Sequence, residues 1–305
     1  MTQAVKRRAK VELSGTKKRT SGRWLAYGLW IAVSLVVFAR PLGWMIHFAL
    51  QNDDASHILL IPVISAWVIY LERQNVFYQL SSDIPSAVFL FFVAGFFYAW
   101  TTWSGANWTL PSNLTGYLLA LVLFWISGFA LFFGRPALQN ARFPLLFLFL
   151  AVPLPEFLLN RAILVLQKGS AEITAALFDL MGVPFLREGF VFHLARVNIE
   201  VARECSGIRS SMALLILALL VAHFSLKSIW KKALFVACGL FMMIIKNGIR
   251  IATLTMLAMY VDPSFLTGKL HHQGGIVFFL LGLLFLLPVL LFLQRSEREE
   301  SSAIN

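Results

Sequence analysis

Long apolar runs recur along this chain, separated by short segments that carry most of the charge, and this pattern constrains the fold more than any other feature. A helix needs about 20 predominantly apolar residues to cross the hydrocarbon of a bilayer. Hydrophobic residues make up 59% of the 305 positions and charged residues 13%, whereas soluble domains have roughly 45–50% and about 25%. The pattern therefore predicts an all-α polytopic membrane protein.

Eight transmembrane helices are predicted, at residues 24–48, 56–72, 86–104, 114–133, 143–159, 207–224, 230–260 and 272–293. Lysine and arginine gather in the connections after the second, fourth and sixth spans, which the positive-inside rule places in the cytoplasm. The connection at 104–113 carries no charge and is expected outside. Because the number of spans is even, both termini are expected in the cytoplasm.

The basic charge of the chain is concentrated at its N-terminus. Eight of the 26 lysines and arginines lie in residues 1–23, and the formal net charge is +11. The other basic residues mostly punctuate the apolar runs, so contact with anionic membrane lipids is expected, and nucleic-acid binding is not. The predicted organisation is a cytoplasmic tail at 1–23, one transmembrane domain at 24–293 and a cytoplasmic tail at 294–305.

The segment 160–206 is expected on the outer side, although it is rich in arginine, because the positive-inside rule acts weakly on longer structured loops. Helical apolar spacing at 161–182 predicts a periplasmic helix that lies along the interface. Alternation with period two at 190–202 predicts a small β-hairpin. This hairpin would lead directly to Cys205.

The two cysteines do not form a disulfide framework, since Cys205 and Cys238 are expected at different depths of the membrane. Cys238 is interpreted as a small buried hydrophobic residue. The sequence has neither metal-ligand spacing nor a glycine-rich phosphate loop. We therefore expect neither a metal nor another cofactor.

Three separate parts of the sequence converge at the predicted outer membrane surface. Cys205 precedes the sixth span, and His271 and His272 open the eighth. Arg250 lies about 28 Å along the seventh span from the cytoplasmic Lys232, close to the outer edge of a core about 30 Å thick. A thiolate attacks a carbonyl, a histidine exchanges protons and an arginine stabilises an oxyanion or clamps a carboxylate. These residue types together describe acyl transfer through a thioester.

Other interpretations account for the same residues. A cysteine in a loop is usually inert, and a histidine at a helix mouth commonly serves as an interfacial anchor, while Lys246 and Arg250 can extend to lipid headgroups. A transporter or lipid-handling protein could instead bind an anionic group within the membrane through Lys246, Asn247 and Arg250. The absence of an internal repeat counts against this alternative. Residue spacing by itself leaves these interpretations open.

Three blocks resemble, in this order, the signature blocks of the exosortase/archaeosortase family of membrane cysteine transpeptidases. They are VARECSGIRSSMALL at 201–215, KNGIRIATL at 246–254 and HHQGGIVFF at 271–279. The resemblance continues upstream through DDASHILLIPVISAW at 53–67 and through residues 142–189, and it covers most of residues 50–290. Any one block is a weak signal, but their joint occurrence in this order is specific.

The resemblance implies that Cys205 is the nucleophile and that Arg250 is the arginine of an Asn-x-x-Arg block. A histidine of HHQGG is the third member, as in exosortases, whereas the similar archaeal enzymes have arginine there. The family spacing of histidine, glycine and aromatic residue favours His271 over His272. The implied activity is cleavage of C-terminal sorting signals on exported proteins, at the outer face of the bacterial inner membrane.

The implied partners are exported proteins that end in a short motif such as Pro-Glu-Pro, a hydrophobic helix and a basic tail. The acceptor of the acyl group stays open between a lipid amine, a polysaccharide component and water. Arg209, one turn after Cys205, and Asn247 are secondary candidates for the site. Asp54 and His57 match an upstream block of the family, but helix packing explains them equally well.

Overall fold

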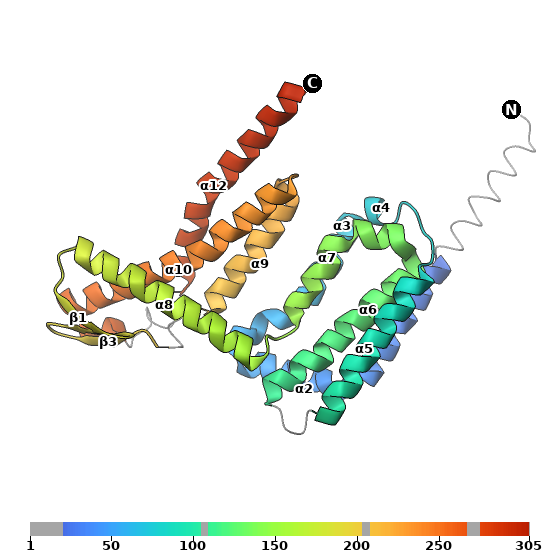
Figure 1. Ribbon diagram of the computed structural model, residues 1–305, viewed down its shortest axis with the longest axis horizontal. Coiled ribbons are helices and arrows are strands. Elements are labelled where there is room, and N and C mark those ends of the chain that lie inside the picture. The colour runs from blue at the N-terminus through green and yellow to red at the C-terminus, as the bar shows by residue number, and fades with distance from the viewer. Residues whose placement is uncertain (1–20, 105–108, 203–207, 267–274, 305) are drawn as a thin grey trace, which may run out of the picture. The chain divides into compact units, whose positions relative to one another are not determined.

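The computed structural model describes residues 21–104, 109–202, 208–266 and 275–304 (Figure 1). The chain divides into two compact units, residues 1–156 and 157–305, and each has its own hydrophobic core. Helices dominate both units, and the second unit also contains a small sheet. The predicted all-α class is therefore confirmed.

The first unit packs its helices around α6. Its elements are the helix Ser21–Val37, α2 (Ala39–Gln51), η1 (Asp53–Leu59), α3 (Ile61–Leu71), α4 (Arg73–Val76), α5 (Ile84–Ser104), α6 (Leu110–Asn140), α7 (Arg142–Phe147) and η3 (Leu148–Ala151). α5 lies along α6 (Figure 1). The first helix approaches α6 at Gly128, where an added Cβ would come within 2.4 Å of the Trp30 ring. This close approach lets the Trp30 indole stack on Phe124 and donate to its carbonyl oxygen.

In its described residues, the second unit combines four helices, one short 3-10 helix and three short strands. Its elements are α8 (Glu156–Leu180), β1 (Phe185–Glu188), β2 (Val191–Leu194), β3 (Asn198–Glu200), α9 (Ile208–Ser225), α10 (Ile229–Tyr260), η5 (Pro263–Leu266) and α12 (Gly275–Ile304). Apolar side chains of α9, α10 and α12 form one core, around Leu214, Met243 and Leu286. A second core joins the sheet to α8 and α10.

The sheet is antiparallel with the order β1-β2-β3. Its buried face carries Phe192 and Leu194 of β2 and Ile199 of β3, which pack against Phe178 of α8. Gly189 has a φ of +63° in the turn between β1 and β2, a conformation that glycine adopts without steric cost. The predicted hairpin corresponds to β2 and β3, and β1 adds a strand that the alternation at 190–202 did not include.

The predicted count of eight spans is not confirmed exactly. In the described part of the chain, four helices are long and apolar enough to cross a bilayer: α5, Ser112–Asn140 of α6, α10 and Ile276–Glu300 of α12. Ser21–Val37 with Ala39–Gln51, and Arg142–Ala151 with Glu156–Leu180, pass the same test only as pairs. The apolar segments His57–Leu71 and Ser210–Ser225 are shorter. Each predicted span has a helical counterpart, but length and composition support four to six crossings.

The fifth predicted span, 143–159, is not one continuous helix. Helical structure ends at Ala151, and α8 begins at Glu156, before the start of the interfacial helix predicted at 161–182. Pro153 and Pro155 lie between them. Proline has no N–H to donate and disfavours helical backbone in the residue before it, so helical structure is interrupted where apolar composition alone suggested continuity.

The surface of the long helices is itself apolar. Phe89, Phe92 and Phe96 of α5 and Phe285 and Phe292 of α12 are exposed. Contiguous apolar surface of this kind is unfavourable in water and is the expected surface of a helix that faces lipid. The exposed rings thus support the same conclusion as the composition, namely that this is a membrane protein.

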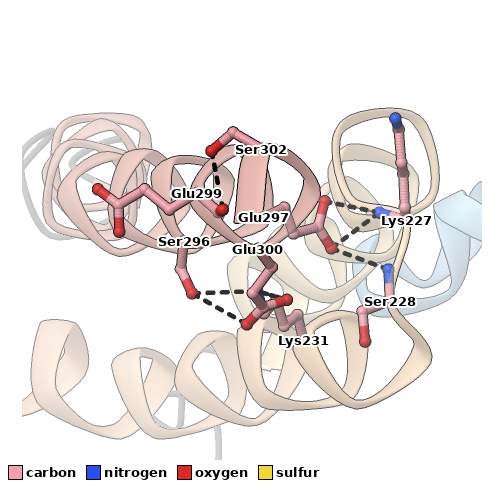
Figure 2. A network of polar contacts seen from close by, with 8 residues as sticks. All are labelled: Lys227, Ser228, Lys231, Ser296, Glu297, Glu299, Glu300 and Ser302. Atoms are coloured by element: carbon pink, nitrogen blue, oxygen red, sulfur yellow. Dashed lines mark hydrogen bonds and ion pairs between the residues drawn. The ribbon is translucent and has the colours of Figure 1, made fainter. Parts of the chain in front are cut away.

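The C-terminal end of α12 is tied to the start of α10 by a set of contacts that we call the C-terminal clasp (Figure 2). The clasp consists of Lys227, Ser228, Lys231, Ser296, Glu297 and Glu300. The Glu297 carboxylate accepts the backbone N–H groups of Lys227 at 3.0 Å and Ser228 at 2.8 Å. Lys231 is fully buried and places its Nζ 2.9 Å from Oε2 of Glu300.

The clasp provides partners for two kinds of group that would otherwise lack them. These are the N–H groups at the start of a helix and a buried charge. N–H groups at a helix N-terminus have no intrahelical acceptor, and a carboxylate there also complements the helix dipole. The Lys231 ammonium is compensated by Glu300 and donates to Ser296 Oγ at 3.1 Å. The C-terminal tail predicted at 294–305 is therefore helical as far as Ile304 and packs through these contacts.

Candidate active site

The candidate site residues of the second unit whose side chains the structure describes lie on α10. Arg250 is half-buried, whereas Lys246 and Asn247 are 2% and 1% exposed. Lys246 and Arg250 are four residues apart and therefore lie on the same face of the helix. Three polar or charged side chains within two turns of a span are costly in a membrane and commonly mark a functional site.

Lys246 connects α10 to α9. Its ammonium donates a hydrogen bond to the hydroxyl of Ser210, in the first turn of α9. The aliphatic stem of Lys246 lies beside Gly282 of α12, where an added Cβ would be 3.6 Å from Cδ of the lysine. Lys246 therefore sits where α9, α10 and α12 meet, with its stem in the apolar core and its amine on a hydroxyl.

Asn247 connects α10 to α8. Its amide donates to Ser170 Oγ at 3.0 Å, and Thr174 Oγ1 donates to the Gly248 carbonyl at 3.3 Å. At Gly248 a Cβ would come within 2.5 Å of the Ile173 side chain, so only glycine permits the two helices to approach this closely. These contacts hold α10 against α8 within one turn of Arg250.

The chain is anchored on both sides of the segment 203–207, which contains the predicted nucleophile Cys205. Before it, the buried Val201 accepts a hydrogen bond from the Gln167 amide of α8 at 2.9 Å. After it, Ser210 accepts the hydrogen bond from Lys246. Both anchors lead to the same group of helices, α8 and α10.

The structure describes only some of the residues that the sequence singled out. Cys205, His271 and His272 lie outside the described residues, as do the side chains of Arg209 and Asp54. His57 is half-buried in η1 of the first unit. Asn247 and Arg250 lie on α10 as their shared block implied. The proposed grouping of Cys205, Arg250 and a histidine therefore stays a prediction.

Sequence reasoning missed the polar residues of α8 that contact α10. The buried positions of this helix include Gln167, Ser170, Ala171, Thr174 and Phe178. Their spacing of three and four residues marks one helix face. The polar members were a usable signal, since small hydroxyl and amide side chains on an otherwise apolar face often form hydrogen bonds between membrane helices.

The region beyond α10 adds one acidic group outside the spans. The backbone N–H of Ser264 donates to Asp262 Oδ1 at 2.7 Å, and this hydrogen bond lowers the pKa of Asp262 from its ordinary value. Asp262 therefore stays ionised near neutral pH.

Within the ranges that the structure describes, no group of three histidine, cysteine, aspartate or glutamate side chains is placed to hold a metal ion.

The apolar helices and the polar contacts on α10 define a polytopic membrane protein with a candidate site inside its helical part. Residues 44–288 match the family described as transmembrane exosortase, and the chain belongs to that family. No curated protein and no solved structure matches the chain. The family comprises membrane cysteine transpeptidases, and membership supports a transpeptidase-type role for this protein.

Proposed function

We propose that this protein is a cysteine transpeptidase that cleaves C-terminal sorting signals from exported proteins and transfers the cleaved proteins to an acceptor. The family match is the observation that carries this proposal, because residues 44–288 include all three blocks that supply Cys205, Arg250 and the histidine pair. The substrates are exported proteins with a motif such as Pro-Glu-Pro, a hydrophobic helix and a basic tail.

In the proposed reaction, the Cys205 thiolate attacks the carbonyl carbon of a peptide bond near the outer end of the substrate helix. The C–S bond forms, the tetrahedral intermediate collapses, and the C–N bond breaks. His271 protonates the leaving amine, which departs with the hydrophobic helix. An acceptor nucleophile then attacks the thioester and releases Cys205. Arg250 stabilises the oxyanion in both steps.

The contacts around α10 support the role given to Arg250. Stabilisation of an oxyanion requires donors whose positions are set before the reaction begins. Asn247 and Gly248 hold α10 to α8 through Ser170, Thr174 and Ile173. Arg250 therefore extends from a helix whose position is restrained within one turn of the guanidinium, as a preorganised site requires.

The proposed location is the bacterial inner membrane, with both termini in the cytoplasm and the active site facing the periplasm. The support is the distribution of lysine and arginine among the short connections. Reporter fusions at Ser228 and at Gly189 should report opposite compartments. The same compartment for both would overturn this topology.

The function is tested by removing the proposed nucleophile. Cys205→Ala should abolish processing of the substrate, measured on a gel as loss of its C-terminal helix, while the protein still accumulates in the membrane. Cys205→Ser should also be very poor, because a hydroxyl ionises far less readily than a thiol. Cys238→Ala is the matched control, since Cys238 is a free, half-buried thiol within α10. Substantial processing by Cys205→Ala would remove the central claim.

The histidine assignment has its own test. His271→Ala should be inactive and His272→Ala mildly affected, if His271 donates the proton to the leaving amine. Processing rates of the two variants are compared at matched membrane levels. An inactive His272→Ala beside an active His271→Ala would reverse the assignment.

A second candidate function is the binding of an anionic group within the membrane by Lys246, Asn247 and Arg250, as in a transporter or a lipid-handling protein. The burial of Lys246 favours it, because a buried cation attracts an anion. The Asn247 amide already donates a hydrogen bond to Ser170, which counts against the binding of an anion there. Substitution of Cys205 distinguishes the two functions, since transport does not require a thiol.

A further inference from the structure

Ser210 and Lys246 form a hydroxyl–amine pair that the proposed transpeptidase reaction does not use. The two residues come from different helices, 36 positions apart in the chain, and are joined by the hydrogen bond from Lys246 to Ser210. Lys246 is almost completely buried, and Ser210 is half-buried. A partly exposed hydroxyl beside a buried amine is the arrangement of a serine–lysine dyad.

Apolar groups and a second cation lie near Lys246. Its stem lies among apolar groups, near Gly282 of α12, and Leu214 of α9 approaches the same glycine. In the described part of the chain, no carboxylate forms an ion pair with Lys246, and Arg250 is a second cation one turn away. A neutral amine can accept a proton from a hydroxyl.

The position of Ser210 in its helix supports the chemistry. Ser210 lies in the first turn of α9, which begins at Ile208. The N–H groups of a first turn have no intrahelical acceptor and carry the positive end of the helix dipole. Negative charge that develops next to Ser210 during attack on a carbonyl is therefore stabilised by the helix itself.

We propose that Ser210 and Lys246 form a second acyl-transfer centre, which accepts acyl groups with apolar chains from esters or thioesters. This activity goes beyond the proposed transpeptidase function and does not depend on Cys205. The class of substrate follows from the side chains beside the dyad, because the Lys246 stem, Leu214 and Met242 all lie near Gly282 and are apolar.

The reaction proceeds by transfer of one proton and exchange of one bond. Lys246 Nζ takes the proton from Ser210 Oγ as the oxygen attacks the carbonyl carbon. A C–O bond forms, the tetrahedral intermediate collapses, and the C–O or C–S bond to the leaving group breaks. Lys246 returns the proton to the departing alkoxide or thiolate. Attack of water or another hydroxyl on the Ser210 ester, again assisted by Lys246, completes the cycle.

The proposal is tested with an alkyl fluorophosphonate, which forms a covalent bond with activated serines. The full chain carrying Cys205→Ala is used, so that the thiol cannot react. We expect the label on Ser210, located by mass spectrometry of the peptides. Lys246→Met keeps an apolar stem of similar length and should slow labelling at least about 100-fold, within the range of general-base catalysis. Ser211→Ala is the matched control and should label at the parental rate.

The dependence on pH separates a base from a structural contact. With Lys246 present, the labelling rate should rise with pH as the ammonium loses its proton. Lys246→Met should lack this ionisation. Lys246→Arg retains a donor for Ser210 but stays protonated at all accessible pH values, so a folded Lys246→Arg protein should remain unlabelled.

Two results would overturn the proposal. One is the absence of label on Ser210 in the Cys205→Ala protein, and the other is equal labelling with and without the lysine amine. If Lys246→Met does not accumulate in the membrane, Lys246→Arg decides the question. Substrate processing is measured separately on protein that retains Cys205, so that failure of the dyad and failure of the transpeptidase proposal are distinct outcomes.

Discussion

Two lysines of α10, Lys231 and Lys246, are both buried, yet the structure gives them different partners. Lys231 is 0% exposed and pairs with the Glu300 carboxylate, while Lys246 is 2% exposed and donates to the neutral hydroxyl of Ser210. Lys231 belongs to the C-terminal clasp, and Lys246 lies within one turn of Arg250. The same residue type on one helix therefore occupies two unlike electrostatic environments.

The partner of a buried lysine therefore indicates its role. A buried charge next to a carboxylate keeps its proton and holds two elements together, as Lys231 holds α12 to α10. The Lys246 amine lies next to a hydroxyl and forms no ion pair with a carboxylate among the described residues, and an amine in this position can exchange a proton with the hydroxyl. Lys231 is thus interpreted as structural and Lys246 as chemical.

The largest effect is expected for Arg250→Lys, which places a fourth lysine on α10 beside Lys231, Lys232 and Lys246. A guanidinium offers a planar fork of donors, whereas an ammonium is a compact charge on a flexible stem. If Arg250 holds the oxyanion, the processing rate should fall by on the order of 100-fold or more, the usual cost of one well-placed donor. Rates are measured at matched membrane levels. Nearly parental activity would return Arg250 to a structural role.

Glu300→Gln should destabilise the protein by about 2–3 kcal/mol, because it leaves the buried Lys231 ammonium without its carboxylate. The estimate is below that for a fully buried pair, since the Glu300 side chain is 58% exposed and water screens the charge. Lys231→Met should cost less, because it removes the buried charge itself. Thermal unfolding in detergent compares the two variants. A larger loss for Lys231→Met would break the structural interpretation of the clasp.

Gly248→Ala tests the region around Lys246 without touching the clasp. The added Cβ meets the Ile173 side chain at 2.5 Å and should force α8 away from α10, at a cost of about 1–3 kcal/mol for overpacking. Processing should fall as Arg250 loses its restraint. Gly282→Ala is the matched control, because its Cβ would meet Lys246 only at 3.6 Å. Equal effects of the two alanines on unfolding temperature and processing would contradict this account.

The smallest effect is expected for Glu297→Gln, which keeps an acceptor for the N–H groups of Lys227 and Ser228 but removes the charge. A charge that complements a helix dipole contributes about 0.3–1 kcal/mol at exposed positions. The unfolding temperature should drop slightly, and less at high salt, which screens the interaction. A drop as large as that of Glu300→Gln would show that the cap, and not the ion pair, dominates the clasp.

The sequence predicted the parts of this protein that depend on local pattern. Apolar runs identify membrane helices because each helix satisfies its own backbone hydrogen bonds and needs only a run of apolar side chains. Alternation at 190–202 likewise predicted β2 and β3. The three ordered blocks predicted the family, since a signature of this kind is read from neighbouring residues along the chain. Asn247 and Arg250 followed from one such block.

The breaks in these patterns were harder to predict. Composition treated residues 143–159 as one span, although Pro153 and Pro155 separate η3 from α8. The prolines were visible in the sequence, but proline is tolerated inside membrane helices when neighbouring groups satisfy the freed backbone. Whether the chain continues or turns at a proline depends on what packs beside it, and that information is not local.

Which polar groups come into contact depends on how the helices pack. The sequence identified Lys246 as an intramembrane cation, but not that Ser210 accepts its hydrogen bond, and it placed Lys231 and Glu300 in separate cytoplasmic segments. Lys246 and Lys231 have the same side chain, are both buried and belong to one helix. Their partners come from α9 and α12, distant in the chain, and the packing of the helices determines which of them reaches each amine. The electrostatic environment that separates a structural lysine from a basic one therefore arises only when the helices assemble.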